Sequence, residues 1–255
     1  MELPVNKFKR ALKDKKPQIG MWSSLSSHIV AEILANAGFD WVLLDTEHSP
    51  NELPMVQAQL HAMVGGTASA VVRPAWNDMV LIKRYLDIGA QSLLIPYVQN
   101  ADEAAEAVAA IRYPTRGVRG VAGVTRASRF GRVADYAKRA EEELCLLVQV
   151  ENREGLENLE AIARTDGVDG VFIGPADLAA GLGHLGEQSH PEVQSAIRDA
   201  IGRIRACGKG AGILATDEAS SRRYIEWGTT FTAVGLDVMV LGRELERLCA
   251  KFKAF

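Results

Sequence analysis

The sequence lacks the features of a secreted or membrane-bound protein. It has three cysteines, Cys145, Cys207 and Cys249, and no two of them form a Cys-x-x-Cys pair. An odd, scattered set does not build a disulfide framework and is typical of a reducing cytoplasm. The first ten residues carry charges where a secretory leader needs an apolar stretch, and no apolar run approaches the roughly 18 residues of a membrane span. We therefore expect a cytoplasmic protein without a membrane partner.

The sequence also lacks an excess of charge of either sign. Its net charge is -3 over 255 residues, and the charges are mixed along the chain. A nucleic-acid partner would call for a basic face or stripe, so we expect none. The hydrophobic share of 47% is enough for a large core. No linker or low-complexity stretch divides the chain, so we expect a single domain over residues 1–255 that acts on a small molecule.

Short apolar runs of strand length alternate with longer segments of helical period, which is the pattern of a parallel α/β fold. We expect strands at residues 19–23, 41–46, 70–74, 93–98, 144–150, 170–173, 210–214 and 232–235. Each is followed by an expected helix, at residues 28–37, 53–63, 79–88, 101–111, 154–163, 193–206, 218–227 and 240–253. Eight such units in this length predict a (β/α)8 TIM barrel. Residues 112–132, rich in glycine and arginine, form the main irregularity, and a connection of that length is usually functional.

Polar side chains gather where the expected strands end, which is the end at which barrel active sites are built. They are Asp45, Glu47, His48, Arg73, Gln149, Glu151 and Asp177, and the small apolar Ala176 precedes the last of them. Glu151 and Asp177 each follow an otherwise apolar run, and a buried charge is costly unless it is paired or binds a metal. Two carboxylates with open positions for water and substrate suit a hard divalent cation, Mg²⁺ or Mn²⁺, with Co²⁺ or Zn²⁺ as alternatives.

Each of these residues also has a plainer interpretation. Glu151 could pair with Arg73 or Arg153, and Asp177 could cap the helix that follows it. His48 could be an ordinary loop histidine, although Asp45 in the same turn could orient its imidazole as a general base. Arg73 could pair with a rim acid, or it could hold a carboxylate or enolate oxygen beside a metal.

Several segments together resemble the HpcH/HpaI family of class II pyruvate aldolases. They are residues 40–49, 71–78, 113–120, 126–130 and 169–178, and the likeness extends over nearly the whole chain. It implies cleavage of 4-hydroxy-2-oxo acids to pyruvate and an aldehyde at a divalent cation, so that no Schiff-base lysine is required. Consistently, no lysine is expected at a strand end, since Lys83 lies on a helix and Lys209 at a strand start.

The resemblance also implies roles for individual residues. His48 matches the proton acceptor, Arg73 the transition-state stabiliser, and Glu151 and Asp177 the metal ligands. Gln149 and Ala176 match substrate contacts, and Asp87 matches an acid that raises the basicity of the histidine, from a neighbouring subunit in some members. We add Trp22, Leu214 and residues 121–124 as the wall around the aldehyde. The resemblance implies a hexamer, a dimer of trimers that exchange the last helix.

Two other functions remain open from the sequence. One is an acyl-CoA lyase of the citrate lyase β-subunit or malyl-CoA lyase type, which would need room and basic contacts for a nucleotide. The other is a barrel without catalytic activity, which would have no need of a charged rim.

Overall fold

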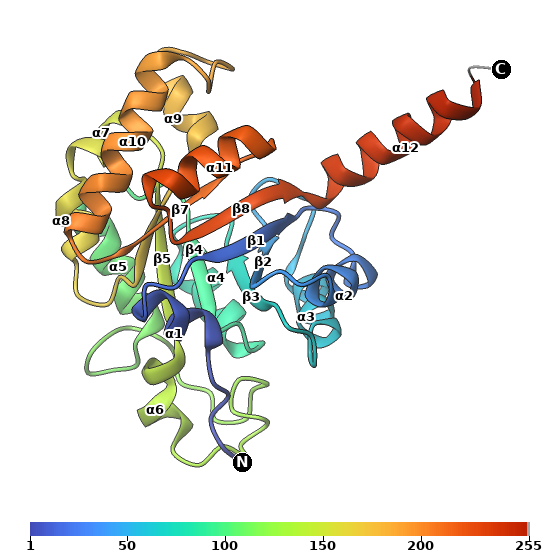
Figure 1. Cartoon of the computed structure of the whole chain (residues 1–255). Helices are drawn as coiled ribbons and strands as arrows, with labels where there is room; N and C mark the ends of the chain where they lie inside the picture. The colour runs from blue at the N-terminus through green and yellow to red at the C-terminus, as the bar shows by residue number, and fades with distance from the viewer. Residues whose placement is uncertain (254–255) are drawn as a thin grey trace.

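A computed structural model describes residues 1–253 and contains a closed barrel of eight parallel strands (Figure 1). The strands follow one another around the barrel in chain order. They are β1 (Gln18–Ser23), β2 (Trp41–Asp45), β3 (Ser69–Arg73), β4 (Ser92–Ile95), β5 (Cys145–Val150), β6 (Gly170–Ile173), β7 (Gly210–Leu214) and β8 (Phe231–Leu236). The expected (β/α)8 barrel is confirmed.

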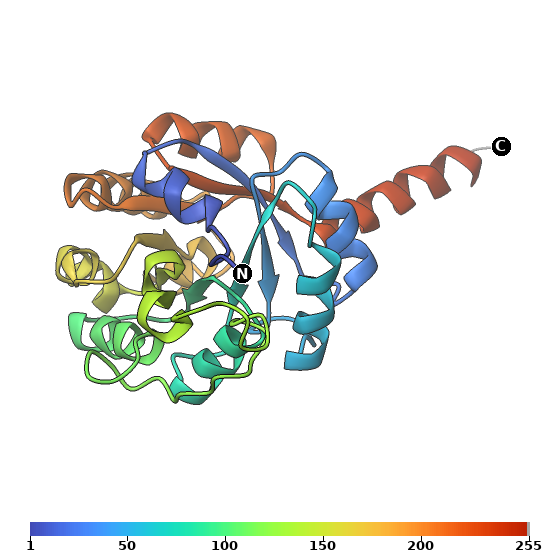
Figure 2. The same cartoon turned by 90° about the horizontal axis from the view of Figure 1, so that it is seen from below.

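Between consecutive strands the chain forms helices that surround the barrel (Figure 2), and one further helix precedes β1 and another follows β8. They are α1 (Lys7–Lys13), α2 (His28–Asn36), α3 (Leu53–Ala62), α4 (Met79–Asp87), α5 (Ala101–Ile111), α6 (Tyr136–Glu143), α7 (Arg153–Glu157), α8 (Leu159–Arg164), α9 (Pro175–Gly181), α10 (Pro191–Ala206), α11 (Glu218–Trp227) and α12 (Asp237–Lys253). None of the helices within residues 1–253 combines the length and hydropathy needed to cross a bilayer.

The helix starts follow from local capping chemistry. The side chains of Ser27, Asp78, Asn100 and Asp217 each accept a hydrogen bond from a backbone N–H in the first turn of α2, α4, α5 and α11. Such caps satisfy N–H groups that have no partner inside the helix. The one expected helix over residues 154–163 is instead two short helices, because Asn158 leaves the helical conformation between α7 and α8.

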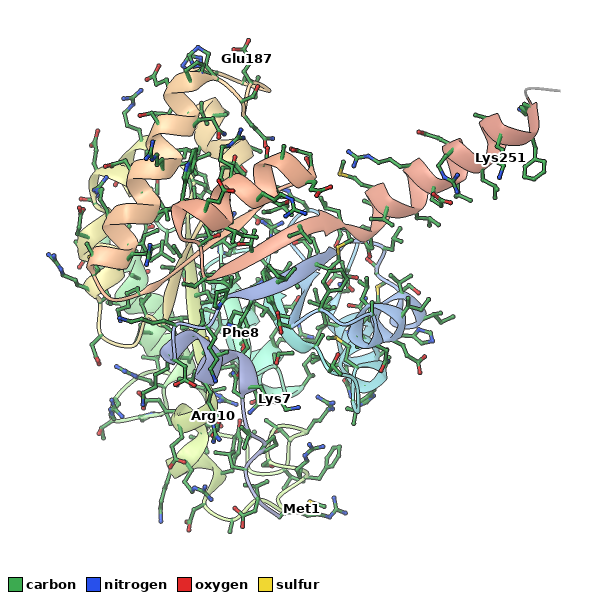
Figure 3. The ribbon with its side chains drawn as sticks, viewed as in Figure 1. Met1, Lys7, Phe8, Arg10, Glu187 and Lys251 are labelled. Atoms are coloured by element: carbon green, nitrogen blue, oxygen red, sulfur yellow. The ribbon has the colours of Figure 1, made fainter. Side chains whose placement is uncertain are left out.

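An aromatic cluster fills the inside of the barrel. Trp41 and Phe231 lie with their ring centroids 6.0 Å apart, and Phe8 of α1 lies 5.8 Å from each of them. The strands make room for these rings with glycine, because a Cβ on Gly20 or Gly212 would lie 2.1 Å from Trp41 or Phe231, respectively. The sequence pattern did not predict α1, which closes the amino-terminal end of the barrel (Figure 3).

The last helix, α12, leaves the barrel and extends away from it (Figure 1). Asp237 at its start fixes the point of departure, because its carboxylate accepts hydrogen bonds from Ser23 Oγ at 2.9 Å and from the backbone N of Ser24 at 2.9 Å. The helix therefore begins in firm contact with the end of β1. Beyond that anchor, its apolar side chains are exposed.

Candidate active site

A cavity of about 310 Å³ opens at the carboxyl ends of the strands. This is the end at which (β/α)8 barrels bind their ligands. Its walls are formed by Trp22, Ser24, Asp45, His48, Arg73, Gln149, Phe172, Gly174, Pro175, Ala176, Asp177, Gln188, Leu214, Thr216, Leu236 and Val238. The structure thus brings together Asp45, His48, Arg73, Gln149, Ala176, Asp177, Trp22 and Leu214 from the set expected on sequence grounds.

Arg73, at the end of β3, is a buried guanidinium between two carboxylates. Its Nε and Nη2 donate to Asp45 Oδ1 and Oδ2 at 2.9 and 2.7 Å, and Nη1 lies 2.8 Å from Glu47 Oε2. The guanidinium carbon also lies 4.9 Å from the Trp22 ring centroid. A planar cation fixed on several sides is pre-oriented toward the cavity. Arg73 therefore presents a fixed positive charge at the cavity wall.

The pKa values of the two carboxylates follow from this arrangement. Burial acts to raise the pKa of Asp45, but the hydrogen bonds and charge of Arg73 outweigh it and lower that pKa. For Glu47, burial outweighs the charge of Arg73, and nearby Asp45 and Asp177 add to the rise in its pKa. From the sequence, Glu47 is expected at a strand end but has no assigned role. Its contact with Arg73 becomes visible only in the folded structure.

Glu151 follows β5 and is only 2% exposed. Its Oε1 accepts a hydrogen bond from the backbone N of Tyr97 at 2.8 Å, and its Oε2 accepts one from Gln149 Nε2. Burial raises its pKa to about 7, against the effect of the Gln149 hydrogen bond, and the charges of Glu47 and Asp177 add to the rise. The plainer interpretation, a pair with Arg73 or Arg153, is wrong, because neither arginine forms an ion pair with it within residues 1–253.

Asp177 lies in the first turn of α9 with an exposed side chain. The residue at the cap position of α9 is Gly174, and no side chain caps this helix. The plainer interpretation of Asp177 as a cap is therefore wrong. Gly174 also leaves room for Glu151, because a Cβ at residue 174 would lie 2.5 Å from Glu151 Oε2.

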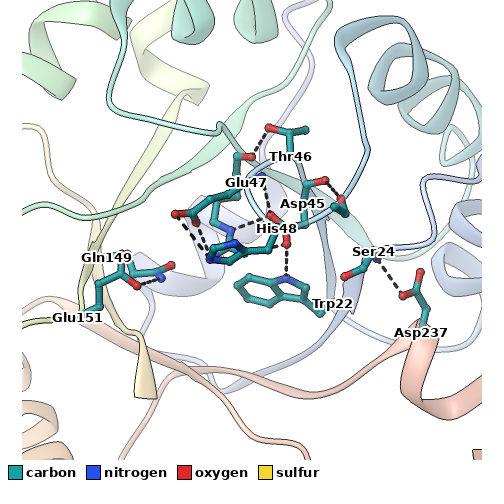
Figure 4. Close-up of polar contacts among 11 residues, drawn as sticks. Trp22, Ser24, Asp45, Thr46, Glu47, His48, Gln149, Glu151 and Asp237 are labelled. Carbon is teal, nitrogen blue, oxygen red and sulfur yellow. Dashed lines mark hydrogen bonds and ion pairs between the residues drawn. The ribbon is translucent and has the colours of Figure 1, made fainter. Parts of the chain in front are cut away.

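His48 is exposed beside this cluster, but its expected pairing with Asp45 is not present. Both oxygens of Asp45 are engaged by Arg73, and Trp22 Nε1 also donates to Oδ2 at 3.2 Å. The acid nearest to His48 is Glu47, whose Oε1 lies 3.9 Å from His48 Nε2 (Figure 4). The expectation failed because a sequence shows which groups share a strand end and does not show which side chain reaches across the barrel.

Asp87 lies at the other end of the barrel from His48. It ends α4, which runs back toward the strand starts, and it accepts a hydrogen bond from Arg119 Nη2 at 3.0 Å. Residues 121–124 belong to the same region, because the neighbouring Ala127 N donates to the Asp87 carbonyl. Within one chain, neither Asp87 nor residues 121–124 reach the cavity. Arg119 is fully buried.

The charges at the cavity fit a bound cation. Four carboxylates, those of Asp45, Glu47, Glu151 and Asp177, influence one another here, and the one guanidinium beside them, that of Arg73, pairs only with Asp45 and Glu47. Burial is the main cause of the raised pKa of about 7 for Glu151, the charges of Glu47 and Asp177 add to it, and a bound cation would act against both effects. Carboxylate oxygens are the ligands that Mg²⁺ and Mn²⁺ prefer.

The fold and the cavity together define a (β/α)8 barrel with an acidic site at the carboxyl ends of its strands. The model of the family described as HpcH/HpaI aldolase/citrate lyase matches residues 18–243. The chain belongs to this family.

Known relatives are similar over their full length. The chain is 62% identical to a pyruvate aldolase of Rhizobium etli, with 99% of each chain covered. It is 55% identical to a hydroxypyruvate/pyruvate aldolase of Pseudomonas aeruginosa, with 99% of this chain and 95% of the relative covered. Among solved structures, an HpcH/HpaI aldolase/citrate lyase family protein of Burkholderia cenocepacia superposes with a TM-score of 0.95 at 40% identity, covering 98% of this chain and all of that one.

Proposed function

We propose that the protein is a metal-dependent aldolase that reversibly cleaves 4-hydroxy-2-oxo acids to pyruvate and an aldehyde. The observation that carries this proposal is the buried Glu151 carboxylate, which accepts a hydrogen bond from Gln149, a residue that lines the cavity together with Asp177, Arg73 and His48. Two relatives are named pyruvate aldolase and hydroxypyruvate/pyruvate aldolase, and these names support the same class of substrate for this protein.

Glu151 and Asp177 would hold the divalent cation. When bound, the cation supplies a Lewis acid that offsets the negative charge developing on the 2-oxo group as the C3–C4 bond breaks. The carboxylate oxygens of Glu151 and Asp177 are hard ligands and favour Mg²⁺ or Mn²⁺. Gln149 would help to orient Glu151 as a metal ligand, because its amide N–H donates to Glu151 Oε2 and fixes that carboxylate.

Arg73 would stabilise the developing charge from the protein side. Asp45 holds the guanidinium by two hydrogen bonds, so Arg73 does not have to reorganise when the substrate changes its charge. Ala176, at the start of α9, and Gln149 would contact the pyruvate portion of the substrate. The Oε1 of Gln149 is buried with no hydrogen-bond partner in residues 1–253 and could accept a hydrogen bond from a water molecule, since the pyruvate portion has no donor.

His48 would take the proton from the C4 hydroxyl during cleavage and return it during condensation. Its exposed ring reaches the cavity, and Glu47 is the acid nearest to it in the same chain. Asp87 can assist His48 only from a neighbouring chain, because within one chain the two lie at opposite ends of the barrel.

Apolar side chains form the part of the wall that would face the aldehyde. Trp22, Leu214, Leu236 and Val238 all line the cavity. Apolar walls discriminate weakly between small aldehydes, so we expect several to be accepted. The same lining argues against an acyl-CoA lyase, because Arg73 is the only lysine or arginine among the cavity-lining residues and it already binds two carboxylates.

The copies of the chain would assemble through α12. Val238, Leu241, Leu245, Leu248 and Phe252 recur at spacings of three and four residues, and all of them are exposed. Such a stripe marks one face of a helix and is normally covered by another element. A second copy of the chain would cover it, in a hexamer built as a dimer of trimers.

The free cysteines Cys145, Cys207 and Cys249 support a place in the cytoplasm.

The direct test of the proposal is pyruvate release from 4-hydroxy-2-oxoheptanedioate by metal-stripped protein. We expect pyruvate only after Mg²⁺, Mn²⁺ or Co²⁺ is added, and none from Glu151→Ala or Asp177→Ala at the same metal concentration. The exposed Glu157→Ala is the matched control and should keep its activity. Pyruvate release without metal, or full activity in Glu151→Ala, would contradict the proposal.

A further inference from the structure

A second group of potential metal ligands lies outside the cavity, on the loop between α9 and α10 and on the first turn of α10. His184, His190 and Glu192 each offer one ligand atom, and these atoms lie within 4.8 Å of one another. The two imidazole rings are stacked, with centroids 3.6 Å apart and an interplanar angle of 17°. His184 Nε2 lies 2.9 Å from Glu192 Oε2.

The backbone of the loop fixes both histidines. His184 N donates to the Ala179 carbonyl at 2.8 Å, and Glu187 N donates to the His184 carbonyl at 2.9 Å. His190 N then donates to the Glu187 carbonyl at 2.9 Å. This chain of bonds spans the loop, at the end of α10 where Figure 3 labels Glu187. The histidines are therefore held near each other before any ligand binds, which lowers the entropic cost of binding.

The chemistry of the group favours a cation with an affinity for nitrogen. His190 Nδ1 accepts a long contact of 3.3 Å from the backbone N of Glu192, and a metal bound to this nitrogen would replace that weak hydrogen bond. Two stacked imidazoles repel each other if both are protonated, and a single carboxylate offsets only one positive charge. Two neutral imidazoles and a carboxylate suit Zn²⁺ or Co²⁺ far better than Mg²⁺.

We propose that His184, His190 and Glu192 form a second divalent-metal site, selective for Zn²⁺ or Co²⁺ and separate from the carboxylate site in the barrel. The side chains of His184 and Glu192 are 21% and 57% exposed, so a cation can reach them from solvent. The site ties the loop to α10, and Gln188 of that loop lines the active-site cavity. A cation bound there would stiffen one wall of the cavity without touching the reacting groups.

Zinc binding to a variant without the barrel ligands tests this proposal. In Glu151→Gln/Asp177→Asn protein, isothermal titration calorimetry should find one equivalent of Zn²⁺, and a large excess of Mg²⁺ should not displace it. Adding His184→Phe, which keeps an aromatic ring over His190, should weaken Zn²⁺ binding by about 10-fold to 100-fold. Adding His61→Phe, an exposed histidine on α3, is the matched control and should leave binding unchanged.

A second readout is independent of calorimetry. Zn²⁺ should raise the thermal midpoint of the Glu151→Gln/Asp177→Asn protein, and this rise should disappear in the variant that also carries His184→Phe. No bound Zn²⁺ in the protein without barrel ligands, or equal binding with and without His184, would overturn the proposal. In that case the group is an ordinary ion pair between His184 and Glu192.

Discussion

Arg73 is the residue on which the geometry of the site depends most. Its fork of N–H groups holds both oxygens of Asp45, and its third nitrogen reaches Glu47. A lysine keeps the charge but cannot make these contacts together. We expect Arg73→Lys to lower the rate of pyruvate release by about 100-fold or more in a steady-state assay. The exposed Arg222→Lys on α11 is the control, and equal rates in the two variants would contradict this role.

Glu151 makes the stability of the metal-free protein depend on pH. Its folded pKa of about 7 lies above the ordinary value of 4.5, so between these values the folded protein holds a proton that the unfolded chain lacks. The free energy of unfolding must therefore fall as the pH rises through this window. We expect Glu151→Gln to gain up to about 3 kcal/mol over the parent protein at pH 8, and little at pH 4.

Urea unfolding in the presence of a chelator measures this difference. Glu157→Gln, at an exposed position on α7, is the control and should follow the parent at every pH. A Glu151→Gln protein no more stable than the parent at pH 8 would show that Glu151 is already ionised at no cost. Because a bound cation competes with the same proton, metal affinity should also be lower at pH 6 than at pH 8.

The residues of the site could be predicted from the sequence where the signal is a polar group at the end of an apolar run. Glu151, Asp177, Arg73 and His48 all stand in that position, and all lie at or directly behind one cavity. Their partners could not be predicted, because side-chain contacts across a barrel depend on its closure. Asp45 thus pairs with Arg73 rather than with His48.

At the scale of elements, α1 closes the amino-terminal end of the barrel through Phe8. This ring is 1% exposed and contacts Trp41 and Phe231. We expect Phe8→Ala to lower the free energy of unfolding by about 3–5 kcal/mol, because a large cavity would remain. The exposed Lys7→Ala is the control, and chemical denaturation is the measurement. A loss below about 1 kcal/mol would show that α1 contributes little.

The elements that could be predicted are those with a clear period and clear ends. The strands β6 and β7 and the helices α5 and α11 have the expected limits, since apolar runs or caps mark them. The helix α1 could not be predicted, because its two buried residues, Phe8 and Leu12, are too few to give a helical period. The break between α7 and α8 carries no glycine or proline as a signal.

At the scale of the whole molecule, the proposed assembly of copies of the chain depends on α12. Replacing both Leu241 and Leu245 by glutamate would place charges in the centre of its apolar stripe. If the parent protein is the hexamer that we propose, we expect sedimentation velocity to show a smaller species for this variant, because buried unpaired charges destabilise an interface. Glu246→Gln, on the same helix, should leave the assembly unchanged. A parent protein that sediments as a monomer would contradict the assembly through α12.

Exchange of the methyl protons of pyruvate with D2O, followed by NMR, is a direct test of metal-dependent enolate formation in this cavity. This reaction needs only the enolate of pyruvate, so it does not depend on which aldehyde is the partner. We expect exchange in the presence of Mg²⁺ or Mn²⁺, and its loss in Glu151→Ala and Arg73→Ala. Exchange that is independent of added metal, or no exchange with any divalent cation, would contradict the account.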